Sequence, residues 1–534
     1  MASSLAVREY FSGRSILISG GTGFMGKVMI EKLLYSMPEI DTIYILMRPK
    51  RGKSVQQRVS DILKLPIFDR IRKENPIILK KLKPIQGDVL FDDLGISSAD
   101  LEMVKKEVSI IYHFAATLKL EAPLKDNVNM NTSGTLRILK IAKEVKNLSL
   151  FVHLSTAFCY PDYEVLGETV RRLNSRTHPP TVSPYDVIRL CEWLDDKQLA
   201  ILTPSLLGIH PNCYTYSKRL AESLVEEAYS ELPCVIARPS IVIPAVMEPM
   251  PGWVDSLNGP VGVMVGAGKG VIRTMLCNGN LVAQIIPVDS AINAVICLTA
   301  EEGLKTENFG NSEYNLLPIN IPVYNLNAAN QKPTTWGQVL DNAKVIGREA
   351  PLAWPLWYPN GDMTTNHVAH HIKCFFYHWI PAYFIDFLLF IVGQKRFMCR
   401  VQKKVTQGLE VLQYFTMRKW DFGSANYEAL EKKLSKKEQQ MFPIDIEKHD
   451  INVYLRNCIE GGRLYCLKED PTRVPLNRIH HNILYFLDLI FKILLFLLIL
   501  SFLASWFEPV RTLFSYGGPV VRVLPLLGSA VFNE

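Results

Sequence analysis

The chain lacks the cysteine patterns of a disulfide framework or a metal site. Its ten cysteines are scattered through 534 residues, with no Cys-x-x-Cys pair and no cluster of cysteine and histidine at ligand spacing. The opening stretch, MASSLAVREYFSGRS, lacks the apolar segment of a secretory signal. These absences predict free thiols, no metal, and a main portion that faces the reducing cytosol.

A strong charge surplus is also lacking. The net charge is +7, charged residues make up 21% of the chain and hydrophobic residues 48%. Short basic stretches such as RPKRGK and KKLKP are typical of solvated surface, and no basic stripe interleaved with aromatics follows. We therefore expect a globular protein of two domains that does not bind nucleic acid.

One long apolar run stands near the C-terminus. Residues 483–507, ILYFLDLIFKILLFLLILSFLASWF, contain only Asp488 and Lys492 as charged residues. A membrane span needs about 20 apolar residues, so a single span is the first interpretation and an in-plane or re-entrant helix the alternative. Basic side chains precede the run and favour a cytosolic N-terminal side: Arg473, Arg478, His480 and His481.

Short β-branched runs alternate with helical stretches in the first part of the chain. Expected strands are 15–19, 42–47, 83–87, 109–114, 149–154 and 234–238, and expected helices include 24–36, 132–146 and 214–231. This alternation predicts an α/β fold with a doubly wound, parallel Rossmann-type sheet. The expected units are a dinucleotide-binding domain at 10–340, a mainly helical domain at 355–475, a membrane helix at 483–507 and a short tail at 508–534.

Within the helical domain, residues 374–393, CFFYHWIPAYFIDFLLFIVG, are unusually apolar. One interpretation is a buried helix pair interrupted by Pro381. The other is a surface that enters a bilayer or lines an acyl tunnel. The residues alone favour neither.

A glycine cluster, SGGTGFMGK, directly follows the first expected strand and opens a helix. Gly20, Gly23 and Gly26 have the spacing of a dinucleotide site, where one glycine allows a tight turn, one admits the pyrophosphate and one packs helix on strand. The helix start offers unpaired N–H groups to the phosphates. The neighbours Thr22, Phe24 and Met25 are also expected to contact the cofactor.

The residues after the second expected strand indicate which cofactor the protein binds. Arg48 stands where an NAD site would carry an acidic residue, and arginine suits a 2′-phosphate, so NADP(H) is favoured. Asp88, after the third strand, could accept a hydrogen bond from adenine. Ala115 and Ala116, after the fourth strand, are small enough to let the cofactor lie against the backbone.

Candidate catalytic residues follow the fifth strand. Ser155 and Thr156 stand at the carboxyl edge of the sheet, where ligands bind in open α/β folds. Tyr214 and Lys218, four residues apart, share one face of a helix. A neighbouring ammonium is expected to lower the pKa of the tyrosine from its usual value toward a working range.

These motifs resemble those of the extended short-chain dehydrogenase/reductase superfamily. The stretches HFAAT, HLSTAF, PNCYTYSK and IARPSIV, with HWIPAYFIDFLL and LRNCIEGGRLYCLKED in the second unit, are similar to alcohol-forming fatty acyl-CoA reductases over nearly all of 10–470. The resemblance implies a catalytic set of Thr156, Tyr214 and Lys218, with Lys218 also holding the cofactor. Ser19, Cys213 and Tyr216 depart from the commoner family residues without removing a functional group.

The resemblance implies NADPH-dependent reduction of a long-chain fatty acyl-CoA to a primary alcohol through an aldehyde. A membrane-anchored tail also fits the family, so a bilayer is the expected partner. The endoplasmic reticulum is favoured, with peroxisome or lipid droplet as alternatives, and a homo-oligomer stays open. Two other functions stay open: another membrane-bound dehydrogenase of the superfamily, acting on steroids or sugar nucleotides, and a catalytically silent cofactor-binding scaffold.

Overall fold

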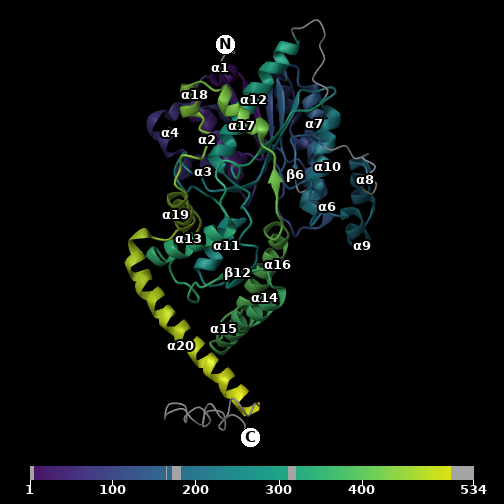
Figure 1. Cartoon of the computed structure of the whole chain (residues 1–534). Coiled ribbons are helices and arrows are strands. Elements are labelled where there is room, and N and C mark those ends of the chain that lie inside the picture. The colour runs from purple at the N-terminus through teal and green to yellow at the C-terminus, as the bar shows by residue number, and fades with distance from the viewer. Residues whose placement is uncertain (1–4, 164, 171–181, 311–319, 507–534) are drawn as a thin grey trace.

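Seven parallel strands form the central sheet of the protein (Figure 1). The computed structural model describes residues 5–163, 165–170, 182–310 and 320–506. The strand order is β11-β7-β5-β4-β1-β2-β3. The strands are β1 (Ser15–Ser19), β2 (Thr42–Met47), β3 (Leu82–Gln86), β4 (Val108–His113), β5 (Leu150–Leu154), β7 (Cys234–Pro239) and β11 (Val323–Leu326). The six predicted strands are confirmed to within one residue, and β11 was not predicted.

Helices cover both faces of the sheet, which explains why its strands are nearly continuous apolar runs. Alternate side chains of β1 enter two different cores: Ile16 and Ile18 join the core of one face, and Leu17 joins the other. The first face carries α2 (Phe24–Ser36) and α12 (Val288–Gly310), and the second carries α7 (Gly134–Glu144) and α10 (Cys213–Ala228). The predicted doubly wound fold is confirmed.

The predicted helix start at Thr132 is wrong. A π-helical segment, η4 (Val128–Ser133), runs from α6 (Leu124–Asn127) directly into α7. Thr132 does not cap a helix, because its hydroxyl donates to the Ser217 carbonyl at 3.0 Å across the interface with α10. A tertiary contact has therefore replaced the local capping role that the threonine suggested.

Strand order reverses between β1 and β4, which pair with each other and continue outward in opposite directions. In open parallel sheets such a reversal leaves a crevice beyond the carboxyl ends of the strands, where ligands bind. The loops that follow β1, β4 and β5 all end at this edge, so the structure places the residues singled out above around one crevice.

The second unit is mainly helical, as predicted. It contains α14 (His367–Cys374), the π segment η5 (Phe375–Trp379), α15 (Ile380–Ile391), α16 (Met398–Thr416), α17 (Ala425–Lys433), α18 (Lys436–Met441), α19 (Ile451–Gly461) and the π segment η6 (Gly462–Cys466). Two short parallel pairs join it to the first unit: β12 (Asp362–Thr364) with β9 (Thr274–Leu276), and β13 (Asp421–Phe422) with β6 (Val165–Leu166).

The apolar segment 374–393 is not an interrupted, buried helix pair. Helix runs from His367 to Ile391 without a break, and Pro381 lies in the first turn of α15, directly after η5. Its aromatic side chains are largely exposed: Phe384 is 59% exposed and Phe390 65%. The interpretation as a buried pair is therefore wrong.

The C-terminal helix α20 (Val474–Trp506) begins nine residues before the predicted start at 483. Figure 1 shows it leaving the body toward the end of the molecule where α14 and α15 also lie. Residues 471–503 and 367–391 are long and apolar enough to cross a membrane. The predicted tail, 508–534, lies outside the described residues.

Candidate active site

The turn after β1 is built around glycines that the backbone requires. Gly20 has φ +77°, and a Cβ there would lie 2.6 Å from the Ala115 backbone nitrogen. A Cβ on Gly26 would lie 2.5 Å from the Gly20 carbonyl oxygen. Both contacts are with backbone that cannot move aside, so any larger residue would displace the turn. The turn after β1 therefore packs directly on the turn after β4.

Gly23 is different, because the protein itself leaves room beside it. A Cβ there would meet only the Gly20 carbonyl oxygen, at 3.2 Å. Gly23 is exposed and is the N-cap of α2, where no side chain caps the first N–H groups of the helix. Such N–H groups at a helix start bind phosphate. The open side of this turn fits the pyrophosphate of a dinucleotide.

Thr22, Phe24 and Met25 lie on the accessible side of the turn and are partly buried. The Phe24 ring stacks on Trp253, with centroids 5.4 Å apart and planes inclined by 21°. This contact brings the segment around Trp253 over the start of α2, so the turn forms one wall of a site.

Arg48 and Asp88 lie together, at the ends of β2 and β3. The Arg48 Nη1 is 2.9 Å from the Asp88 Oδ2, and the Arg48 side chain remains 54% exposed. Asp88 also accepts a hydrogen bond from the Leu90 backbone. The exposed guanidinium retains donors for a phosphate, while the pair holds it at the crevice. Both residues lie where a ribose and adenine would extend from the glycine turn.

Beneath the turn lies Ser19, one of the residues that differ from the commoner family residue. Its hydroxyl accepts a hydrogen bond from the Ala115 backbone at 3.3 Å and contacts the His113 Nδ1 at 2.8 Å. The His113 Nε2 contacts the Thr135 hydroxyl at 3.0 Å. Burial and the nearby Lys218 charge lower the pKa of His113 to about 3, so the ring is neutral. Ser19 thus ties the two turns to α7.

Asn131 continues this polar chain to α10, and sequence reasoning missed it. Its Nδ2 donates to the Ser217 hydroxyl at 2.9 Å, and its Oδ1 accepts from the Thr117 backbone at 2.8 Å. The Ser217 hydroxyl donates to the Tyr214 carbonyl at 2.8 Å. Asn131 lies in the π segment η4, and such segments often mark functional sites, but the primary sequence carries no signal of it.

Thr156 and Tyr214 meet at the carboxyl end of β5. The Tyr214 phenol lies beside the Thr156 hydroxyl, which favours the ionised form of the phenol and so lowers its pKa. Lys218 lies one helical turn beyond Tyr214, and its Nζ donates to the Leu154 carbonyl at 2.7 Å. Ser155, in contrast, lies close to Cys159 and Glu222, and its buried hydroxyl has no hydrogen-bond partner among the described residues. The structure therefore brings Thr156, Tyr214 and Lys218 together and turns Ser155 away.

The expected direction of the Tyr214 pKa is wrong. Burial raises it above its usual value, the Cys159 thiol adds to the increase, and the Thr156 hydroxyl only partly opposes it. Burial lowers the pKa of Lys218 to about 8, against the influence of Glu222. Desolvation is therefore the largest influence on both pKa values, and Lys218 is not among the groups that shift the Tyr214 pKa. Tyr214 stays protonated at neutral pH, which suits a group that donates a proton.

A buried ion pair supports the site from behind. The Arg238 Nη2 is 2.6 Å from the Glu222 Oε2, and neither side chain is exposed. Burial alone would raise the pKa of Glu222, but the Arg238 guanidinium holds it below its usual range. Arg238 also donates to the Gly167 and Thr169 carbonyls. Sequence reasoning missed this pair, because its residues lie on β7 and α10 and only the fold brings them together.

An aromatic cluster from the second unit stands beside Thr156. Phe158 is in edge-to-face contact with Phe415, Trp420 and Phe422, at centroid separations of 5.1 to 5.2 Å. Phe158 follows Thr156 by two residues, and its backbone N–H donates to the Thr156 hydroxyl at 3.3 Å. The second unit therefore contributes an apolar wall to the same end of the sheet as the hydroxyl pair.

Solved structures support this fold. A reductase domain of a nonribosomal peptide synthetase from Mycobacterium tuberculosis superposes with a TM-score of 0.56 at 15% identity, covering 86% of this chain and 95% of that chain. The terminal reductase domain of the myxalamid pathway superposes with a TM-score of 0.50 at 17% identity, covering 86% and 91%. At these identities the likeness concerns the fold alone.

Sequence relatives are more specific. A model of an NAD-binding domain described as male sterility protein matches residues 18–295, and a second model with that description matches 377–469. Fatty acyl-CoA reductase 1 of Mus musculus is 34% identical over 478 residues, 90% of this chain and 89% of that protein. Fatty acyl-CoA reductase 2 of Bos taurus is 34% identical over 492 residues, 92% of each.

Both units and the crevice between the glycine turn and α10 thus fall within one continuous match to these reductases, and the chain belongs to the fatty acyl-CoA reductase family.

Proposed function

We propose that the protein reduces long-chain fatty acyl-CoA to a primary fatty alcohol, with NADPH as reductant and an aldehyde as intermediate. Family membership supports an oxidoreductase that reduces fatty acyl groups with a nicotinamide cofactor. The observation that carries the proposal is the approach of the Tyr214 phenol to the Thr156 hydroxyl, one helical turn from Lys218 and at the sheet edge that holds the glycine turn. This arrangement combines a cofactor site with a proton donor.

Arg48 supports NADPH over NADH. Its guanidinium is exposed at the end of β2 and is paired there with Asp88. A 2′-phosphate would add a second anionic partner to a cation that presents several donors in a fixed plane. An unmodified ribose hydroxyl would gain much less from the same guanidinium. We therefore assign the preference for NADPH to Arg48.

Thr156 and Tyr214 would hold the substrate carbonyl oxygen. Bound NADPH would supply one hydride to the thioester carbonyl carbon, and a second NADPH, bound after NADP⁺ has left, would supply one to the aldehyde carbon. Both hydroxyls are positioned to donate hydrogen bonds to the oxygen as negative charge develops on it. Coenzyme A leaves when the first adduct collapses, and in the second reduction Tyr214 gives its proton to the alkoxide. Lys218 supports Tyr214 and would hold the nicotinamide ribose.

The substrate and membrane assignments depend on the second unit and α20. The aromatic wall around Phe158 supports an apolar substrate close to Thr156, and α20 supports attachment to a bilayer. We propose a membrane-bound enzyme whose catalytic portion faces the cytosol, in the endoplasmic reticulum in preference to peroxisome or lipid droplet. A homo-oligomeric state stays a prediction.

The two other functions are less well supported. A steroid or sugar-nucleotide dehydrogenase of the superfamily would share the cofactor turn, yet the family match extends through residues 377–469 of the second unit. A silent scaffold would have no need of a protonated tyrosine beside Thr156 and a buried lysine.

The test is an assay of the purified, detergent-solubilised chain with palmitoyl-CoA and NADPH. We expect loss of NADPH, release of coenzyme A and formation of hexadecanol, each measured separately, with products identified by mass spectrometry. Tyr214→Phe is the matched control, since it removes one oxygen and should retain NADPH binding. Folded protein that binds NADPH yet forms neither alcohol nor aldehyde would refute the proposal.

A further inference from the structure

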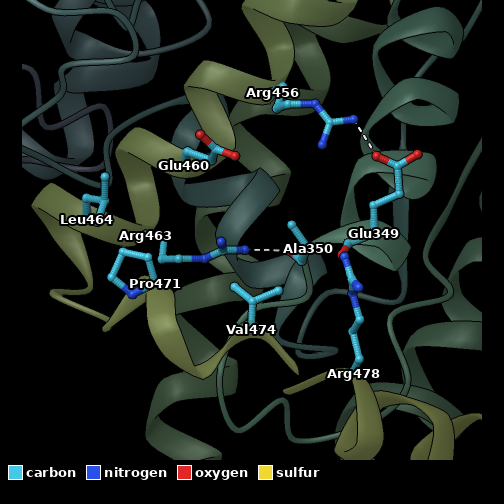
Figure 2. Close-up of a pocket in the computed structure, with 9 residues that line it drawn as sticks. All are labelled: Glu349, Ala350, Arg456, Glu460, Arg463, Leu464, Pro471, Val474 and Arg478. Atoms are coloured by element: carbon cyan, nitrogen blue, oxygen red, sulfur yellow. Dashed lines mark hydrogen bonds and ion pairs between the residues drawn. The ribbon is translucent and has the colours of Figure 1, made fainter. Parts of the chain in front are cut away.

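Helix α20 is docked on the body along its first half. At the start of α20, Arg478 donates to the Glu349 carbonyl at 2.7 Å. Next to it, Arg463 of η6 donates to the Ala350 carbonyl. Figure 2 shows these arginines with Arg456, which pairs with the Glu349 carboxylate, around a cavity of about 470 Å³. The arginines bind the end of α13 (Trp336–Glu349) to α19, η6 and α20. This joint fixes the direction in which α20 leaves the body.

A second attachment lies farther along the helix and explains the charges in the apolar run. Asp488 is 3% exposed, lies 3.1 Å from the Arg273 Nη2 and accepts a hydrogen bond from the Trp357 indole at 2.5 Å. Lys492 pairs with the same carboxylate at 2.6 Å. The apolar residues before Asp488 therefore belong to a helix that lies against the protein, and the free part of α20 starts near Lys492.

Arg273 connects this attachment to the other apolar helix. Its guanidinium stacks on the Tyr377 ring at 4.9 Å, and its backbone N–H donates to the His378 Nε2 at 2.8 Å. Both aromatic residues belong to η5, which leads directly into α15. Arg273 thus contacts both the segment before α15 and the segment before the free part of α20. Both helices extend toward the same end of the molecule (Figure 1).

The exposed face of α15 is apolar and aromatic. Tyr383 is 62% exposed, Phe387 58%, Phe390 65% and Ile391 65%. The segment before α15 in the continuous helix 367–391 is held on the body, because His370 of α14 and His378 of η5 are hydrogen-bonded to residues 274 and 273. The partner of α15, helix α16, is rich in charged side chains. The geometry is that of a helix lying in a membrane interface.

The turn between α15 and α16 is cationic. Asp386 accepts hydrogen bonds from the backbone N–H groups of Phe397, Met398 and Cys399 at 2.8 to 3.0 Å, which closes the hairpin. Five exposed cations follow within ten residues: Lys395, Arg396, Arg400, Lys403 and Lys404. The sequence has no Asp or Glu from residue 387 to residue 409. An apolar face bordered by uncompensated cations complements anionic phospholipids.

We propose that the α15–α16 hairpin is a second membrane contact, in which the α15 aromatic face inserts into the bilayer interface and the cationic turn binds anionic phospholipid headgroups. The free part of α20 holds the same membrane close by. The protein is therefore attached at two points and its body has a fixed orientation to the bilayer. The proposal is independent of the reaction proposed above, because it requires no turnover.

The experiment is photocrosslinking of the full chain in vesicles of phosphatidylcholine, with and without phosphatidylserine. Phe387 is replaced by p-benzoylphenylalanine, and Trp193, which is 77% exposed on α8 (Pro184–Trp193) of the first unit, is replaced as the control. A third site, Phe496 on α20, reports that the anchor is inserted. We expect phospholipid adducts from Phe387 and Phe496 and none above background from Trp193.

The cationic turn is tested in the same chain by K395Q/R396Q/R400Q. Each cation near an anionic surface contributes roughly fivefold to binding, so the adduct from Phe387 should fall about fivefold or more with phosphatidylserine present and change little without it. The Phe496 adduct should be unaffected, and the single substitutions serve if the triple variant fails to fold. Lipid adducts from Phe387 no higher than from Trp193 would overturn the proposal. So would adducts formed only with added acyl-CoA or with a second copy of the chain.

Discussion

At the scale of single residues, the charge of Lys218 depends strongly on its surroundings. Its Nζ is fixed on the Leu154 carbonyl, and Glu222 lies four residues farther along α10. Burial lowers its pKa to about 8 although Glu222 favours the charged form. A lysine that is about half protonated near pH 8 makes the site sensitive to mildly alkaline conditions.

We expect the reduction rate to fall as pH rises through about 8, because Lys218 is an ammonium below that pH and neutral above it. Because its pKa is raised, Tyr214 stays protonated over the same pH range, and its titration should not change the rate there. The measurement is kcat/KM for acyl-CoA as a function of pH. Lys218→Arg retains the charge and should move the alkaline limb upward; an unchanged limb would assign it to another group.

Arg48 is expected to set the choice between the two nicotinamide cofactors. Arg48→Gln should raise the Kd for NADPH roughly 10- to 100-fold, the contribution of a charge-assisted phosphate contact, and should change the Kd for NADH little. Arg51→Gln, which removes an equal charge from the same loop, is the control and should have an effect below about twofold. Equal losses in the two variants would indicate a general electrostatic effect of the loop.

Residues with a fixed local spacing could be predicted, and residues joined only by the fold could not. The glycines of the turn and the pair Tyr214 and Lys218 are defined by neighbours in the chain. Asn131 and the Glu222–Arg238 pair depend on contacts between η4, α10 and β7. The Tyr214 pKa was predicted in the wrong direction, because the degree of burial cannot be read from spacing.

At the scale of secondary structure, the glycine turn separates two roles that the sequence pattern presents as equal. Gly26 is enclosed by backbone at 2.5 to 2.6 Å, and Gly23 faces open space apart from one contact at 3.2 Å. The first is required for α2 to pack on β1. Gly23 is required only if a ligand approaches the turn from outside.

We therefore expect Gly26→Ala to destabilise the protein by about 1–3 kcal/mol, as in an overpacked core. Gly23→Ala should unfold within a few tenths of a kcal/mol of the parent and yet bind NADPH about tenfold or more weakly, because its methyl group occupies the phosphate approach. Urea unfolding and NADPH fluorescence titration measure the two effects. Unchanged NADPH affinity in Gly23→Ala would argue against phosphate binding at this turn.

Strands and helix ends differ in how well they could be predicted. The strands are buried on both faces, so their apolar runs are continuous and their bounds were predicted to within one residue. The three described π segments, η4, η5 and η6, were missed; η4 and η5 are stabilised by tertiary partners such as Ser217 and Arg273. Pro381 was expected to break a helix, but the π segment before it absorbs the lost backbone hydrogen bond.

At the scale of the whole molecule, the two units share a core beside the hydroxyl pair. Phe158 of the first unit and Trp420 of the second lie edge to face, with centroids 5.2 Å apart. The strand pair β6–β13 lies next to them. The predicted domain boundaries stay a prediction, since contacts of this kind cross them at several places.

A double-mutant cycle on Phe158→Ala and Trp420→Ala should measure this connection. Each single change should cost about 3–5 kcal/mol of unfolding free energy, with a coupling of about 0.5–1.5 kcal/mol from the ring contact. The measurement is urea unfolding followed by circular dichroism. Phe158→Ala with Phe68→Ala, a buried residue in a separate core cluster, should be additive within about 0.5 kcal/mol. Additivity in the first pair would show that the units unfold separately.

The position of Phe158 has a consequence for exchanging parts between related enzymes. A chimaera that takes residues after 340 from a relative would place foreign aromatic side chains against Phe158, two residues from Thr156. It would also pair a foreign strand with Val165–Leu166. A chimaera designed to transfer substrate preference should therefore also take residues 157–170 from the relative. These residues and those after 340 pack on each other and should be exchanged together.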